Sequence, residues 1–344
     1  SIGSYYTPFN LAKFIAEYCL SQIDKQNIAV LEPSVGDGNF VQAINEFERL
    51  DDFKNITLTI VEREKEELKK AKKKNVNKSI KITSLNKDYL NFHFSNKKKF
   101  SAILGNPPYV KNNFLTSEQK ELAKEIHLEQ NLANRKINNI WTSFLVSGIS
   151  KLQNDGILAF VLPLELLQVK FTEEIRHLLK SSFERIEIFM FDELQFLECK
   201  GQDTVLLIGY KQHKAPGTFY TTIKSIDELK NRDFKLYKNK SVSDSNKKWT
   251  HHFITPDEHS FLEKIKKELN LVSDYVDNKA GIVTAANNYF IVDKETLDKF
   301  KLNNYAKPIV QKGFFVNGSV TFNRNDYSKL IRENKPAFLL DFNN

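Results

Sequence analysis

The chain has 344 residues, of which 41% are hydrophobic and 27% are charged, which is the composition of an ordinary globular protein. This length exceeds that of most single domains, so we expect two domains. No apolar run approaches the roughly 18 residues that a membrane-spanning helix needs, which excludes an integral membrane protein. The two cysteines, Cys19 and Cys199, belong to no CxxC motif, which excludes a disulfide framework and a cysteine-ligated zinc site. These features predict a cytoplasmic protein.

Basic residues outnumber acidic ones. The chain has 51 Lys and Arg residues against 43 Asp and Glu residues, which gives a formal charge of +8. This balance suits a polyanionic partner such as nucleic acid, but many proteins without such a partner share it. The first residues hold neither an initiator methionine nor a basic and apolar leader, so we expect the chain to begin inside a longer protein.

The predicted elements begin with a helix to about residue 20, for which Thr7 has the character of an N-cap and Pro8 that of a first helical residue. From residue 28 onward, short β-branched runs alternate with helical, charge-rich stretches, which predicts an α/β fold with a mostly parallel sheet. The expected strands are 28–31, 56–61, 80–83, 102–104, 157–162, 186–189 and 204–210, and the later helices cover about 41–49, 140–152 and 172–180. The last two strands have no room for a crossover helix, so they should form an antiparallel hairpin at the edge of a seven-stranded sheet.

The composition changes after Tyr210. Residues 211–248 have only scattered apolar positions, so we place a domain boundary near residue 245. The remainder has a helical segment at about 257–269, followed by short strands with glycines, which predicts a smaller mixed α+β domain. The expected domains are residues 1–245 and 246–344.

Two glycines lie at the turn between the first strand and the next helix. Residues 32–40 read Glu-Pro-Ser-Val-Gly-Asp-Gly-Asn-Phe, which places Gly36 and Gly38 at this turn. Glycines in such a turn let backbone amides approach a ligand closely. A tight turn in an α/β sheet that binds no ligand would show the same pair, so the turn alone does not define a site.

Acidic residues follow the second and third strands. Glu62 comes 24 residues after Gly38 and matches the carboxylate that accepts hydrogen bonds from ribose hydroxyls in nucleoside-binding α/β folds. Asp88 and Tyr89 follow the third strand, where a carboxylate could accept from an adenine amino group and a ring could pack on the base. The alternatives are a surface helix start for Glu62 and an ordinary turn for the other two residues.

The fourth strand leads into Asn106, Pro107, Pro108 and Tyr109. Two consecutive prolines remove two backbone donors and fix φ, which predicts a rigid loop that presents carbonyls and one side-chain amide. Asn106 Oδ1 and the Pro107 carbonyl could each accept a hydrogen of an NH2 group, and Tyr109 offers a face for stacking. A structural Pro-Pro turn after a strand is the alternative.

The Asn-Pro-Pro-Tyr loop and the glycine-rich turn together resemble the S-adenosylmethionine-dependent amino-methyltransferases. Family members that modify adenine in DNA begin with a segment like residues 3–8 (Gly-Ser-Tyr-Tyr-Thr-Pro), placed before the cofactor loop in the gamma-type order. The resemblance implies a Rossmann-like seven-stranded methyltransferase sheet with an antiparallel last strand. It also implies S-adenosylmethionine as the cofactor and duplex DNA as the partner.

The resemblance assigns roles to the cofactor residues one by one. Tyr6 and Thr7 would lie near the methionine end of the cofactor. Glu62 would bind its ribose hydroxyls, Asp88 its adenine amine and Tyr89 its adenine ring. The other expected cofactor residues are Glu32, Pro33, Gly36, Gly38 and Asn106.

For the target base, the resemblance implies catalytic roles for Asn106, Pro107, Pro108 and Tyr109. Family members also carry an aromatic residue before the last strand that stacks on the far side of the base, and Phe196 occupies that place, with a role in the core as the alternative. A sulfonium methyl group is already electrophilic, so alignment of the amine suffices and no metal is expected. A base inside a duplex must be flipped out to reach such a pocket.

The second domain shows a weaker pattern at residues 281–292 and 307–310. These segments resemble the start of target-recognition domains in enzymes that fuse methylation to restriction, although Thr284-Ala285 stands where those families usually have Thr-Gly. An ordinary strand pair is the alternative. The expected second domain is therefore the N-terminal part of a DNA target-recognition domain.

The sequence favours a site-specific DNA adenine-N6 methyltransferase of a restriction-modification or related defence system. Two alternatives stay open: a methyltransferase of the same fold that acts on RNA or on a glutamine side chain, and an inactive DNA-recognition subunit. We see no nuclease motif within the chain, so a restriction or further specificity segment would lie outside it.

Overall fold

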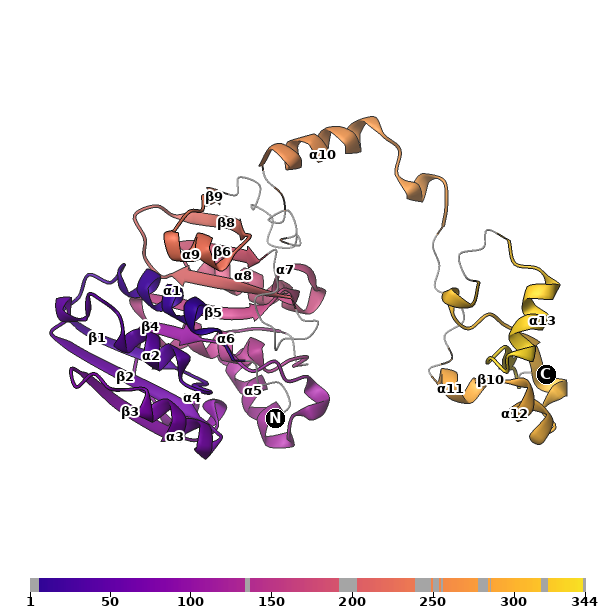
Figure 1. Cartoon of the computed structure of the whole chain (residues 1–344), viewed down its shortest axis with the longest axis horizontal. Coiled ribbons are helices and arrows are strands. Elements are labelled where there is room, and N and C mark those ends of the chain that lie inside the picture. The colour runs from indigo at the N-terminus through magenta and orange to yellow at the C-terminus, as the bar shows by residue number, and fades with distance from the viewer. Residues whose placement is uncertain are drawn as a thin grey trace. The chain divides into compact units, whose positions relative to one another are not determined.

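The computed structural model describes residues 6–133, 137–191, 203–238, 249, 254, 256–277, 284, 286–316 and 321–342. Spatial contacts divide the chain into two compact units, residues 1–264 and 265–344 (Figure 1). The division falls within helix α10 (Pro256–Glu268), beyond the boundary that composition places near residue 245. The boundary near residue 245 reflects a change in composition, whereas the division at residue 264 reflects the density of spatial contacts.

Nine strands of the first unit, within the residues that the structure describes, form one sheet in the order β3-β2-β1-β4-β5-β7-β6-β8-β9 (Figure 1). The strands from β3 to β5 pair in parallel, as do β6 and β8. Strand β7 is antiparallel to both β5 and β6, and β9 is antiparallel to β8. The bounds are β1 Asn27–Glu32, β2 Asn55–Glu62, β3 Ile80–Asn86, β4 Phe100–Gly105, β5 Leu152–Pro163, β6 Arg185–Phe191, β7 Thr204–Tyr210, β8 Gly217–Ile223 and β9 Tyr237–Lys238.

The seven expected strands are present, and the predicted antiparallel pairing of β6 with β7 is confirmed. The predicted strand number and edge are wrong, because β8 and β9 extend the sheet beyond β6 and β7 inserts between β5 and β6. Near the sheet edge β8 buries only part of its side chains, so its apolar pattern in the sequence is weak.

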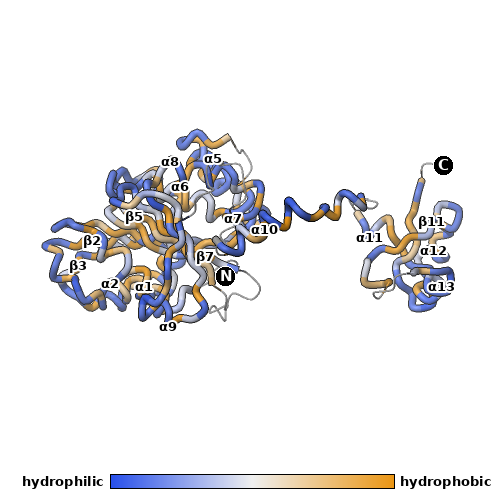
Figure 2. Tube along the Cα trace, turned by 90° about the horizontal axis from the view of Figure 1, so that it is seen from above, coloured by the Kyte–Doolittle hydropathy of each residue, from blue (hydrophilic) through white to orange (hydrophobic). Residues whose placement is uncertain are grey.

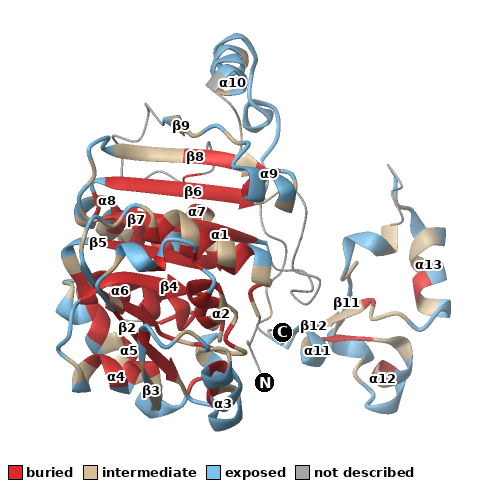
Figure 3. Ribbon diagram, turned by 60° about the vertical axis from the view of Figure 1, so that its left-hand side comes forward, coloured by how far each residue is buried: buried red, intermediate tan, exposed pale blue. Residues whose placement is uncertain are grey.

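Helices cover both faces of this sheet. Successive side chains of a strand point to opposite faces, so Val30 and Leu31 of β1 pack in two different buried clusters. The first cluster includes residues of α1, α2, α3 and α9, and the second includes residues of α4 to α8 (Figure 3). The bounds are α1 Phe9–Leu20, α2 Asn39–Asn45, α3 Lys65–Lys73, α4 Tyr89–Ser95, α5 Ser117–Glu129, α6 Trp141–Lys151, α7 Glu165–Gln168, α8 Glu173–Ser182 and α9 Ile226–Asn231.

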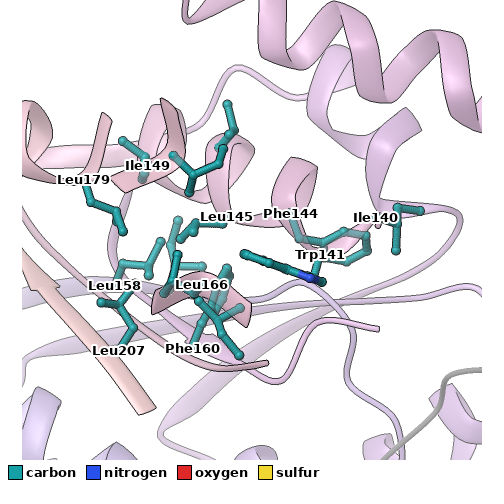
Figure 4. Packing of buried hydrophobic residues seen from close by; sticks show 14 of the residues in the cluster. Ile140, Trp141, Phe144, Leu145, Ile149, Leu158, Phe160, Leu166, Leu179 and Leu207 are labelled. Atoms are coloured by element: carbon teal, nitrogen blue, oxygen red, sulfur yellow. The ribbon is translucent and has the colours of Figure 1, made fainter. Parts of the chain in front are cut away.

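The second cluster lies between α6 and the strands β5 and β7. Figure 4 shows Phe160 of β5 between Trp141 of α6 and Leu207 of the neighbouring strand. Phe160 and Leu207 are partners in the antiparallel register of β5 and β7. Helix α6 lies close to β5 at Gly148, where an added Cβ would come within 2.8 Å of the Leu158 side chain. This packing fixes α6 against the sheet.

The first helix begins one residue later than expected. Pro8 is the N-cap residue of α1, and it makes no side-chain capping bond. Thr7 is therefore not the N-cap, and this prediction is wrong. Thr7 is instead buried, and its Oγ1 has no hydrogen-bond partner in the described part of the chain.

Apolar residues run along the strands of the first unit, and hydrophilic residues predominate on its outer turns (Figure 2). No helix in the described part of the chain has both the length and the apolar character to cross a membrane.

The second unit is a small mixed domain, as the sequence predicts. Its described residues form a three-stranded antiparallel sheet in the order β10-β12-β11, with a small core of Val292, Leu297 and Leu340. Of the segments that resemble a target-recognition domain, residues 281–283 and 285 lie outside the described residues. The bounds are α11 Asn287–Phe290, β10 Ile291–Val292, α12 Lys294–Lys299, β11 Ala306–Pro308, α13 Arg324–Arg332 and β12 Phe338–Leu340.

We expect Leu207→Ala to lower the free energy of unfolding of the first unit by about 2 to 5 kcal/mol, because it removes buried methyl groups and leaves a cavity. Leu207 is fully buried, whereas the control Leu128 on α5 is 51% exposed. Leu128→Ala should change this free energy by less than about 0.5 kcal/mol. Urea denaturation followed by tryptophan fluorescence measures both, because Trp141 and Trp249 belong to residues 1–264. Equal effects would contradict the assigned packing.

Candidate active site

Four parallel strands place the predicted site residues at one edge of the sheet. Strands β3, β2, β1 and β4 are adjacent and parallel, so their carboxyl ends reach the same edge. The chain continues from β1 to β2 on one side and from β3 to β4 on the other, so the strand order reverses between β1 and β4. Ligands of open α/β sheets bind outside the carboxyl ends at such a switch point. The topology therefore brings together segments that are far apart in the sequence.

A pocket of about 850 Å³ lies at this edge, which is within the usual size range of small-molecule and cofactor sites. The predicted residues that line it are Tyr6, Pro33, Gly36, Glu62, Asp88, Tyr89, Asn106 and Pro108. Five other predicted residues do not line the pocket, but each lies within two positions of a lining residue in the sequence. They are Thr7, Glu32, Gly38, Pro107 and Tyr109. Phe196 lies outside the described residues.

The turn after β1 depends on two glycines with left-handed backbone conformation. Gly36 has φ 51° and Gly38 has φ 85°, a region that other residues rarely adopt. A Cβ at Gly38 would come within 2.6 Å of Ala71 Cα on α3, and one at Gly36 would come within 3.1 Å of the Tyr6 ring. Burial and the negative charge of Glu67 raise the pKa of Tyr6 to about 12, so its hydroxyl stays protonated. The Tyr6 ring thus packs closely on the turn.

Glu62, at the end of β2, fixes two backbone segments. Its Oε2 accepts a hydrogen bond from the Gly36 N–H at 3.0 Å, and its Oε1 accepts one from the Glu64 N–H at 2.9 Å. The carboxylate thereby joins the turn after β1 to the turn after β2 while it lines the pocket. Its oxygens have further lone pairs that can accept from a ligand hydroxyl. The expected ribose contact stays a prediction.

Glu32 is a buried carboxyl group at the end of the central strand β1. It is 1% exposed, and none of the described residues forms a hydrogen bond with its Oε2. Burial, together with the negative charges of Asp37 and Glu62, raises the pKa of Glu32 well above its usual range. A buried carboxyl group of this kind favours a nearby cation, because a cation would offset the cost of ionising it.

The loop 106–109 leaves β4 beside the turn after β1. The Ser34 hydroxyl donates to the Asn106 carbonyl at 3.1 Å, which ties this loop to the first turn. The Tyr109 hydroxyl donates to the Val161 carbonyl of β5 at 3.1 Å, and the Tyr109 ring is buried. The loop is thus held at both ends, with Asn106 and Pro108 lining the pocket.

Asp88 and Tyr89 begin helix α4. Asp88 is its N-cap, with Oδ1 accepting from the Leu90 N–H at 2.8 Å and Oδ2 accepting from Gln119 Nε2 at 2.8 Å. The centroids of the Tyr89 and Phe144 rings are 4.6 Å apart. Burial raises the pKa of the Tyr89 hydroxyl. Asp88 therefore caps a helix, where the sequence left an ordinary turn as the alternative, and it lines the pocket as well.

Several lining residues carry no motif in the sequence. Side chains that follow the Asn-Pro-Pro-Tyr loop contribute, as do residues at the start of α6. Gln119 had one local signal, the Thr116-x-x-Gln119 spacing of a capping box, but that pattern predicts a helix start and not a pocket. The residues of this group are Val110, Phe114, Leu115, Gln119, Ile140 and Phe144.

Solved structures show the same fold. The chain is similar to DrdV, solved in complex with DNA, with a TM-score of 0.62 and 14% identity over 98% of this chain and 43% of that chain. It is also similar to the methyltransferase subunit of a type I restriction-modification system from Streptococcus thermophilus, with a TM-score of 0.53 and 18% identity over 79% of this chain and 55% of that chain. The fold is the Rossmann-like methyltransferase fold.

Sequence comparisons then define the family. Residues 14–196 match the family described as Eco57I restriction-modification methylase, and residues 246–344 match the C-terminal domain of the type II methyltransferase M.Eco57I. Because the first match covers more than half of the chain, the chain belongs to the Eco57I restriction-modification methylase family.

Two curated relatives are described as type II methyltransferases. M.AccI of Acinetobacter calcoaceticus is 25% identical, over 99% of this chain and 62% of that protein. M.BanIII of Aneurinibacillus aneurinilyticus is 24% identical, over 90% of this chain and 60% of that protein. The chain thus matches about three fifths of the length of these relatives.

We expect Glu32→Gln to be more stable than the wild type at about pH 8. Because the pKa of Glu32 is raised on folding, the folded state holds a proton that the unfolded state loses. The free energy of unfolding of the wild type should therefore fall as the pH rises from the unfolded pKa toward the folded pKa, by up to about 1.4 kcal/mol per pH unit. Glutamine does not titrate, so the free energy of unfolding of Glu32→Gln should fall less over the same pH range.

Urea denaturation at about pH 5 and about pH 8 measures this difference. The matched control is Glu48→Gln, since Glu48 is exposed, and this variant should follow the wild type. An identical pH dependence in wild type and Glu32→Gln would remove Glu32 as the cause.

Proposed function

We propose that the chain transfers a methyl group from S-adenosylmethionine to the N6 amine of an adenine flipped out of duplex DNA, within a restriction-modification system. The observation that carries this proposal is the position of the rigid loop 106–109 beside a cofactor-sized pocket at the switch point of the sheet. Family membership and the type II methyltransferase relatives support DNA as the substrate.

Buried polar groups beside the pocket fit the methionine end of this cofactor. Glu32 Oε2 and Thr7 Oγ1 have no hydrogen-bond partner among the residues that the structure describes. An ammonium group would donate to Glu32 and hold it ionised, and a carboxylate would accept from the Thr7 hydroxyl. When bound, the cofactor supplies an electrophilic sulfonium methyl group, which needs no metal for its activation.

The remaining contacts fit the nucleoside part of the cofactor. Glu62 would accept from ribose hydroxyls with its free lone pairs, and Asp88 would accept from the adenine amine. Tyr89 would support the adenine ring from the floor of the pocket. The turn that holds Gly36 would present its backbone to the cofactor, because Gly36 lines the pocket.

Asn106 and Pro107 would act on the target amine. An exocyclic amine is a poor nucleophile because its lone pair is delocalised into the ring. Acceptors at Asn106 Oδ1 and the Pro107 carbonyl would bind its two hydrogens and favour a tetrahedral nitrogen with a free lone pair. The bond from Ser34 to the Asn106 carbonyl holds these acceptors in place.

A flipped base costs a few kcal/mol of lost stacking and pairing in the duplex. The Tyr109 ring, which its bond to Val161 holds in one position, would offset part of this cost by stacking. We assign the same role to Phe196 on the opposite side of the base, as the resemblance implies.

DNA reading would belong to the second domain. We propose that residues 1–245 are the catalytic domain and residues 246–344 the N-terminal part of a target-recognition domain, which the match to the M.Eco57I C-terminal domain supports. A restriction or further specificity segment outside this chain is part of the same proposal, because the chain spans only part of its relatives. A cytoplasmic location stays a prediction.

Transfer to RNA or to a glutamine side chain is the second candidate, because the same loop would serve any planar amine. Labelled methyl transfer to duplex DNA, RNA and total protein, followed by nucleoside analysis, separates the candidates. We expect N6-methyladenine in DNA alone. Label in RNA or protein would overturn the choice of substrate, and failure to bind the cofactor would favour an inactive recognition subunit. Cofactor binding without transfer to any of the three would indicate an incomplete recognition domain.

We expect Asn106→Ala to abolish methyl transfer and to leave cofactor affinity within about twofold, because Asn106 acts on the target amine. Asn113 lies on the same segment and is exposed, so Asn113→Ala is the matched control and should keep its activity. Filter binding of labelled cofactor and the transfer assay give the two readouts. Loss of cofactor affinity together with activity would contradict the role assigned to Asn106.

For Glu62→Ala, in contrast to Asn106→Ala, we expect cofactor binding to weaken, by about 1 to 3 kcal/mol. This change removes the acceptors for ribose hydroxyls and frees the Gly36 N–H. Calorimetric titration with S-adenosylhomocysteine measures it, with the exposed Glu48→Ala as control. Unchanged affinity would exclude Glu62 from the cofactor site.

A further inference from the structure

The carboxylate of Asp88 is held by groups from two different helices. The Leu90 N–H of α4 donates to Oδ1, and Gln119 Nε2 of α5 donates to Oδ2, both at 2.8 Å. Asp88 and Gln119 are 31 positions apart in the sequence, and both line the 850 Å³ pocket. The plane of this carboxylate is therefore fixed from both sides at the edge of the pocket.

The side-chain amide of Gln119 has one possible orientation. Its Oε1 accepts from the Thr116 N–H at 3.2 Å, while its Nε2 donates to Asp88. A flipped amide would place Nε2 against an N–H donor and Oε1 against a carboxylate, and both contacts would be repulsive. The capping box therefore determines which atom of Gln119 faces Asp88.

The bond to Asp88 exceeds what helix capping requires. A capping box needs only Gln119 Oε1 and the Thr116 hydroxyl, which leaves Nε2 available to solvent or to another group. A separate, exposed contact already joins the two helices, because Asn91 Nδ2 donates to Glu118 Oε1 at 3.3 Å. The donor of Gln119 is thus directed at a residue of the pocket.

We propose that Gln119 is a positioning residue that orients the Asp88 carboxylate for the 6-amino group of the cofactor's adenine. This inference rests on the proposed function, since it takes Asp88 as the adenine contact. With one lone pair of each oxygen occupied, the remaining lone pairs have fixed directions and accept an N–H from the pocket. A 6-oxo purine offers an acceptor in place of this donor, so the fixed carboxylate rejects it.

Gln119 also connects adenine recognition to the catalytic loop. Helix α5 begins directly after the segment that runs from Asn106 through the pocket-lining Phe114 and Leu115 to the Thr116 cap. The bond to Asp88 anchors the far end of that segment, while the bond from Ser34 to the Asn106 carbonyl anchors its start. The two ends of the segment are thus tied to the two sides of the pocket.

The test is calorimetric titration of the chain with S-adenosylhomocysteine and with its hypoxanthine counterpart, S-inosylhomocysteine. For Gln119→Ala we expect affinity for the adenine compound to fall about tenfold, while affinity for the hypoxanthine compound stays nearly constant. The ratio of the affinity for the adenine compound to that for the hypoxanthine compound should therefore fall about tenfold. Gln119→Glu should lower the affinity for the adenine compound further, because it places a second carboxylate against Asp88.

Glu118→Ala is the matched control, because it removes the exposed contact between the same two helices and leaves Gln119 in place. This variant should keep the wild-type ratio. The inference fails if Gln119→Ala keeps the wild-type ratio, even with a lower melting temperature, or if Glu118→Ala loses the ratio equally. A wild-type chain that binds neither compound would overturn the proposed function as well, which distinguishes the two failures.

Discussion

The candidate site is built around the buried carboxyl group of Glu32, which lies at the end of β1 in the parallel part of the sheet. Parallel partners on both sides of β1 exclude water from this position, and the turn that follows keeps the backbone close. The bond from the Gly36 N–H to Glu62 then holds that turn against the end of β2. The same edge receives the loop 106–109 from β4, tied through Ser34. One topological feature, the switch between β1 and β4, thus brings the buried Glu32 carboxyl group and the loop 106–109 to the same edge of the sheet.

Much of the fold could be predicted from the sequence because most strands are buried on both faces. Strands β1, β4 and β7 each contain a run of apolar residues, and such runs are recognisable without knowledge of the neighbouring strands. Strand β8 pairs near the edge and buries only part of its side chains, so its pattern is diluted. The order of β7 and β6 was beyond the sequence as well, because a hairpin predicts pairing but not which of its strands joins β5.

Some residues of the candidate site could be predicted from the sequence, and others could not. Residues in local motifs, such as Gly36 and Asn106, could be predicted because turn geometry and proline chemistry are properties of a few consecutive residues. Phe144 and Gln119 could not, since they reach the pocket through the packing of α6 and α5, which no local pattern encodes. Thr7 was placed wrongly as a helix cap because its short polar side chain suits that position, whereas its hydroxyl is buried in the first unit.

We propose that the buried Glu32 carboxyl binds the ammonium group of a nucleoside cofactor. Calorimetric titration with S-adenosylhomocysteine near neutral pH, in two buffers of different ionisation enthalpy, tests it most directly, because it counts the protons exchanged on binding. Since burial raises the pKa of Glu32 and a bound cation would lower it again, binding should release protons in the wild type and release fewer in Glu32→Gln. Binding with no proton release, or with the same release in both proteins, would contradict the account.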